Sequence, residues 1–73
     1  MADDKDLIRD TANRLRAARR GKKLTQAEVA AKAGLSENHY AQIERGEKNP
    51  TTSSFRKIIK AIGITSTELF NEK

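Results

Sequence analysis

The sequence predicts a single all-α domain of five helices, spanning residues 1–73. Apolar residues recur at the i, i+3, i+4 and i+7 spacing of an amphipathic helix, most clearly at Phe55, Ile58, Ile59 and Ile62. Glycines and Ser or Thr caps divide the chain into segments of helical length, and no segment alternates as a strand does. A chain this short buries only about 60% of its unfolded surface, so it has room for one small core.

The first helix is expected from about residue 6 to residue 20, because Ile8, Ala12 and Leu15 share one face and Gly21 follows. The acidic residues before it are expected to form a short tail. Residues 71–73 are expected to fray, which leaves an ordered core of about residues 6–70.

The second helix is predicted to begin after Thr25, because Glu28 stands three residues later and completes a capping box. Gly34 is placed where a helix commonly ends in a left-handed residue. Its buried side is expected to comprise Ala27, Val29, Ala30 and Ala33.

Three further helices follow the same logic of caps and apolar faces. Ser36 is expected to cap a third helix, with Tyr40 and Ile43 inside, that stops at Gly46. The fourth helix starts at Thr51 or Thr52 and ends at Gly63, and Thr65 or Ser66 caps a fifth that contains Leu69 and Phe70.

Composition excludes several classes of function. The chain has no Cys and one His, so a disulfide framework or a metal site is not expected. No nucleophile–base combination, Gly-rich phosphate loop or paired carboxylates are present, and the sequence predicts no enzyme, cofactor or small-molecule ligand. The acidic first ten residues do not resemble a signal peptide and no apolar run could span a bilayer, so a cytoplasmic protein is expected.

Positive charge is gathered in two blocks. Residues 11–23 carry a net charge of +6 and residues 45–60 a net +4, whereas residues 24–44 between them carry −2. Clustered basic charge favours a polyanionic partner, most often nucleic acid, although a solvated surface is the common alternative.

The segment between these blocks has the spacing of a helix-turn-helix motif. Its two predicted helices are joined by three residues that include Gly34. The outer side of the second of them carries Glu37, Asn38, His39 and Gln42, which are short polar residues rather than paired Lys and Glu. Asn and Gln can bind adenine bidentately and Glu can accept a hydrogen bond from cytosine, so these three side-chain types match base edges, although a solvated polar face remains the alternative.

Four sequence motifs, LTQAEVAAKAGLS, QIERG, NPT and IGIT-x-x-ELF, resemble those of the Xre/Cro family of lambda-repressor-like helix-turn-helix domains. The resemblance runs from about residue 13 to residue 70. It implies a bacterial or phage-type, nucleoid-associated regulator of transcription, acting as repressor or autoregulator and reading the major groove of double-stranded DNA. It also implies a homodimer, at least on DNA.

The same resemblance assigns roles to individual residues. Arg19 and Glu44 are implied to form a buried structural ion pair. The remaining arginines of the first helix, Arg14, Arg16 and Arg20, are expected to contribute only long-range attraction, because that helix packs behind the motif. Base contacts are implied for Ser36, Glu37, Asn38 and Gln42, and phosphate contacts for Gln26, His39, Arg45, Lys48 and Asn49.

Two alternatives belong to other classes. One is a protein-interaction module, such as a toxin-binding antitoxin, that uses the aliphatic face of the fourth helix and the Leu69–Phe70 end. The other is a nucleic-acid binder that acts through charge alone. Either would lack the sequence preference that a transcriptional regulator needs.

Overall fold

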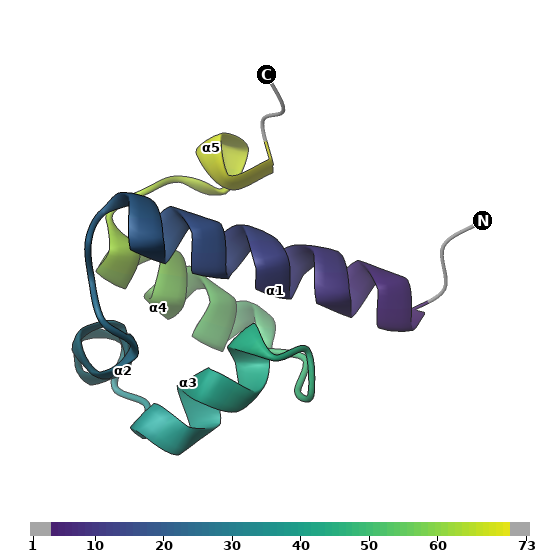
Figure 1. Ribbon diagram of the computed structural model, residues 1–73, viewed down its shortest axis with the longest axis horizontal. Coiled ribbons are helices and arrows are strands. Elements are labelled where there is room, and N and C mark those ends of the chain that lie inside the picture. The colour runs from purple at the N-terminus through teal and green to yellow at the C-terminus, as the bar shows by residue number, and fades with distance from the viewer. Residues whose placement is uncertain (1–3, 71–73) are drawn as a thin grey trace.

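Five helices joined by short loops make up the computed structural model, which describes residues 4–70 (Figure 1). No strand occurs within this range, so the predicted all-α fold class is confirmed. None of the helices in the described residues is long and apolar enough to cross a membrane. The helices are α1 (Asp4–Gly21), α2 (Gln26–Ala33), α3 (Glu37–Glu44), α4 (Thr52–Ile62) and α5 (Ser66–Phe70).

Two helix boundaries differ from the predicted ones. Helix α1 begins at Asp4, so part of the expected acidic tail is helical. Helix α3 ends at Glu44 with Arg45 as its C-cap, and the left-handed residue Gly46 (φ 76°) comes after the helix has ended. Residues 1–3 and the predicted fraying of residues 71–73 lie outside the described residues.

A single apolar core connects all five helices. Helix α2 packs against both α3 and α4, whereas α1 packs against α3, α4 and α5. Figure 1 shows α1 running across the molecule, with α2 and α3 on one side of it and α5 on the other. The buried cluster comprises Leu15, Val29, Ala30, Ala33, Tyr40, Ile43, Ile58, Ile62 and Leu69.

The prediction that Ala27 lies on the buried side of α2 is wrong, because this residue is exposed. The inner face is set by Val29, Ala30 and Ala33, which are 0%, 1% and 4% exposed. Successive helical residues are about 100° apart, so Ala27 is turned roughly 110° from the centre of that face. It therefore faces solvent beside Ala31.

The N-terminus of α2 is fixed by the predicted capping box. The Thr25 hydroxyl accepts from the Glu28 N–H at 3.0 Å, and the Glu28 carboxylate accepts from the Thr25 N–H at 2.8 Å. We expect Thr25→Ala to cost about 1 kcal/mol. For a domain of this size that lowers the melting temperature by roughly 4–8 °C, measurable by circular dichroism.

Thr67→Ala provides the matched control for this cap, since Thr67 is an exposed residue inside α5. It should change the melting temperature little. Equal shifts in the two variants would contradict a capping role for Thr25.

Candidate nucleic-acid interface

The turn between α2 and α3 is held by backbone and cap hydrogen bonds. Gly34 adopts a left-handed conformation (φ 73°), and the Leu35 N–H donates to the Ala30 carbonyl at 2.9 Å. The Ser36 hydroxyl then accepts from the His39 N–H at 3.0 Å and caps α3. Because a residue with a Cβ is strained at positive φ, Gly34 allows the chain to turn sharply here. The direction in which α3 leaves the turn is therefore fixed locally.

Helix α3 has a buried face and a polar face. Tyr40, Ile43 and Glu44 are 0%, 1% and 2% exposed and point into the domain. On the other side, Glu37 and Asn38 are exposed and Gln42 is half-buried. Asn38 and Gln42 are four residues apart, so they are neighbours on the helix surface. The residues predicted to read bases thus gather at the start and on the outer side of one rigid helix.

A buried charge cluster joins α3 to the rest of the fold. The Arg19 guanidinium donates to both carboxylate oxygens of Glu44, from Nε at 2.6 Å and from the second terminal nitrogen at 3.1 Å. It also donates to the Leu24 carbonyl at 2.8 Å. Arg19 is 9% exposed, so both charges are removed from solvent. Glu44, the last residue of α3, is therefore tied to α1 by a bidentate ion pair.

The pKa of Glu44 reflects this environment. Burial by itself would raise the pKa, but hydrogen bonds from Arg19 and Gln26 outweigh it, and the pKa lies below its ordinary value. Hydrogen bonding to the same carboxylate raises the pKa of Arg19. Tyr40 lies beside the pair, and its buried hydroxyl has no hydrogen-bond partner within the described residues. Burial, followed by its contact with Glu44, raises the pKa of Tyr40.

Gln26 brings α2 into the same cluster. It is the first residue of α2, and its side-chain Nε2 donates to Glu44 Oε1 at 3.0 Å. The amide nitrogen carries a second hydrogen, and the residue is half-buried. This bond connects residues 18 positions apart and ties the start of α2 to the last residue of α3.

The loop after α3 carries the other residues predicted to contact phosphate. Arg45, Lys48 and Asn49 are all exposed. The Arg45 guanidinium donates to both oxygens of Glu47, at 2.9 and 3.0 Å, and the pKa of Glu47 is lowered by that bond. The Glu47 N–H donates to the Gln42 carbonyl at 2.9 Å. The loop is thus folded back on the end of α3.

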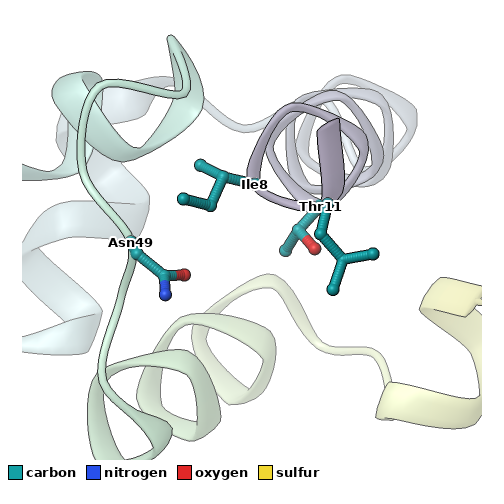
Figure 2. A pocket seen from close by; sticks show the side chains of 4 residues that line it. Ile8, Thr11 and Asn49 are labelled. Carbon is teal, nitrogen blue, oxygen red and sulfur yellow. The ribbon is translucent and has the colours of Figure 1, made fainter. Parts of the chain in front are cut away.

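Asn49 lies on the side of this loop that faces α1. It lines a depression of about 290 Å³ together with Leu7, Ile8 and Thr11 of α1. Figure 2 shows the Asn49 side chain pointing into this space, opposite Ile8 and Thr11. His39, the remaining predicted phosphate contact, is half-buried on α3.

One of the three α1 arginines expected to contribute long-range attraction, Arg14, also has a role in packing. Arg14 lies over the Phe70 ring, 5.4 Å from its centroid, and Nε donates to Asp10 at 2.8 Å. It also donates to the Leu69 carbonyl at 3.3 Å. Arg14 therefore fastens α5 to α1. A contact between residues so far apart in sequence leaves no local pattern from which to predict it.

Comparison with known proteins gives a consistent set of relatives. A family model described as helix-turn-helix matches residues 15–69. The chain is 41% identical over 51 residues to an uncharacterized HTH-type transcriptional regulator, y4dJ, of Sinorhizobium fredii, a match that covers 70% of this chain and 66% of that protein. It is 38% identical over 60 residues to the immunity repressor protein of Bacillus phage phi105, covering 82% of this chain and 42% of that protein.

Among solved structures, the fold matches the restriction-modification controller protein C.AhdI from Aeromonas hydrophila with a TM-score of 0.81. The two chains are 32% identical, and the match covers 86% of this chain and 96% of that one. The chain spans less than two thirds of the length of the two curated relatives, so its likeness to them concerns the helix-turn-helix region.

Proposed function

The chain belongs to the helix-turn-helix family, in its Xre and lambda-repressor-like group, and from this premise we propose that it regulates transcription by binding a specific DNA sequence. The observation that carries the proposal is the polar outer side of α3, which is held outward by a buried ion pair at one end and a capped turn at the other. Helix α3 inserts into the major groove of double-stranded DNA, where its first residues meet base edges.

Base reading is assigned to Ser36, Glu37, Asn38 and Gln42. The amides of Asn38 and Gln42 supply the paired donor and acceptor that adenine presents in the major groove, and Glu37 accepts from cytosine. The exposure of Glu37 and Asn38 supports this assignment. Ser36 keeps its hydroxyl hydrogen as a donor, because its oxygen serves as the cap acceptor.

Phosphate contact is assigned to Gln26, His39, Arg45, Lys48 and Asn49. Gln26 stands at the N-terminus of α2, where backbone N–H groups and the helix dipole favour an anion. The exposed loop residues continue the basic surface beyond the end of α3. Such contacts set the position of α3 in the groove, whereas they carry no sequence information.

We further propose that the protein acts on DNA as a two-fold dimer at the nucleoid. One α3 helix reads only about 4–6 base pairs, and a dimer reads two half-sites about 34 Å apart. The 45% exposure of Phe70 supports this, because an exposed aromatic ring offers apolar surface to a second copy of the chain. A bound dimer that covers promoter DNA would act as a repressor or autoregulator.

Selection from a random pool of duplex DNA, at near-physiological salt, tests this function. We expect the purified protein to enrich a two-fold symmetric site whose half-sites are one helical turn apart. Retention of all sequences equally would contradict sequence-specific regulation and indicate a binder acting through charge. Retention of no DNA, with a stoichiometric protein partner co-purifying, would indicate an interaction module.

A further inference from the structure

A small polar pocket lies between α1 and the end of α3. Its volume is about 150 Å³, and three of its six lining residues are arginines. The lining comprises Arg9, Ala12, Asn13, Arg16, Glu44 and Arg45. Arg45 begins the loop after the helix-turn-helix motif, whereas Arg9 and Arg16 lie on α1, outside both the motif and the loop.

The spacing of residues on α1 brings the pocket's donors together. Arg9, Asn13 and Arg16 stand at i, i+4 and i+7, so they share one face of the helix. Arg16 donates from a terminal nitrogen to the Asn13 side-chain oxygen at 2.6 Å. This bond fixes the orientation of the amide and leaves both of its N–H groups available as donors. The Arg16 guanidinium has further N–H groups of its own.

Close packing of the loop against α1 forms the opposite wall. A Cβ added at Gly46 would lie 3.4 Å from Arg9 Cγ and 3.7 Å from Arg9 Cα, so the backbone of the loop rests on the Arg9 stem. Ala12 lies at the base of the pocket and is only 3% exposed, and its small side chain leaves space in the pocket. Arg45 is held in place by its two hydrogen bonds to Glu47.

The charge balance of the pocket is positive. Glu44 lines it, but this carboxylate is 2% exposed and already accepts from Arg19 and Gln26. Glu47 is the other acidic side chain bound to a pocket residue. Glu44 is thus paired with Arg19, which does not line the pocket, and Glu47 with Arg45, so the guanidinium groups of Arg9 and Arg16 add positive charge that these two carboxylates do not offset. Guanidinium groups suit phosphate oxygens because their N–H fork matches that geometry.

We propose that this pocket binds one phosphate group through Arg9, Asn13, Arg16 and Arg45. The volume equals that of about five water molecules in the liquid, which accommodates a phosphate group but not a nucleoside attached within it. The phosphate comes either from the backbone of bound DNA or from a free phosphate ligand. A phosphate from the DNA backbone rests on the proposed function, since the pocket adjoins the loop assigned to the DNA backbone. A free phosphate ligand does not depend on that function.

Two measurements on the same variants separate these sources. The test variant is Arg9→Gln/Arg16→Gln. The control is Lys57→Gln/Lys60→Gln, which also removes two positive charges, but from α4, where both lysines line a different depression. The first measurement is an NMR titration with inorganic phosphate at constant ionic strength. The second is the salt dependence of binding to duplex DNA, including random-sequence DNA. Melting curves check that each variant folds, and the single substitution Arg16→Gln replaces the test variant if it does not.

For a backbone phosphate, we expect the slope of log K against log salt to fall in magnitude by about 0.9 in the test variant, with binding about five- to tenfold weaker near 0.1 M salt. The loss should be equal on selected and random DNA and small in the control. For a free ligand, we expect saturable shifts of the Asn13 side-chain amide resonances in the wild type that are absent from the test variant.

Equal effects of the test and control variants on DNA binding, with no saturable response to phosphate, would overturn the proposal. That outcome differs from failure of the proposed function, in which the wild type shows no sequence preference. The phosphate titration needs no DNA, and the salt slope is measurable on any duplex.

Discussion

Replacing Glu44 by Gln should destabilise the domain by about 3–5 kcal/mol, because Arg19 would stay buried without its counter-charge. Arg19 and Glu44 are 9% and 2% exposed, so solvent cannot readily take over the lost interaction. In a domain of this size each kcal/mol lowers the melting temperature by about 4–8 °C, so the variant should be largely unfolded near 37 °C. Thermal and urea denaturation followed by circular dichroism measure both quantities.

Glu47→Gln serves as the matched control for this substitution. Glu47 also pairs with an arginine, Arg45, but both side chains are half exposed, at 53% and 50%. Surface ion pairs contribute little to stability, so the control should melt close to the wild type. Similar melting temperatures for Glu44→Gln and Glu47→Gln would show that the buried pair does not hold the fold together.

The ion pair also predicts how stability depends on pH. The pKa of Glu44 is lower in the folded protein than its ordinary value of 4.5, so its contribution is fully present above about pH 4.5. The contribution is lost as pH falls through the folded pKa. The difference in melting temperature between wild type and Glu44→Gln should therefore shrink as pH decreases from 7 to 3. A constant difference across this range would contradict the lowered pKa.

The second large effect is expected on DNA binding. Each bidentate base contact contributes about 1–3 kcal/mol of discrimination, so Asn38→Ala/Gln42→Ala should weaken binding to the selected site by about 30- to 20,000-fold. Random-sequence DNA should be bound almost as well as by the wild type, because phosphate contacts are untouched. Fluorescence anisotropy with both DNAs, at one fixed salt concentration, measures the ratio of the dissociation constants for random and selected DNA.

Stability serves as the internal control for this double variant. Asn38 is exposed and Gln42 half-buried, so the melting temperature should be nearly unchanged. An equal loss of affinity for selected and random DNA would assign the two residues to backbone contact or to folding instead of base reading.

Local signals predicted most of the fold. Caps at Thr25, Ser36 and Thr51 and the left-handed Gly34 and Gly63 act within a few residues of sequence, so pattern and conformation coincide. The family resemblance implied an Arg19–Glu44 pair, and the structure contains one. Ala27 was assigned to the wrong face because Ala is small enough to suit either environment, so its identity says little about burial.

Contacts between distant elements account for what sequence could not predict. The Arg14–Phe70 contact and the pocket beside Arg16 each form only when helices pack together. The arginines of α1 looked alike in sequence, as members of one basic block. In the fold, Arg14 packs against Phe70, whereas Arg16 lines a pocket.

Except at Ser36, the bonds that hold α3 in place and the side chains proposed to read bases come from different residues. Ser36 and Glu44 supply the cap and the ion pair, whereas the side chains of Glu37, Asn38 and Gln42 make no hydrogen bond with described residues. Substitutions at these three positions would therefore leave the cap and the ion pair intact. If these residues read bases as proposed, the same three positions are the ones to randomise in a library meant to change operator preference without loss of stability.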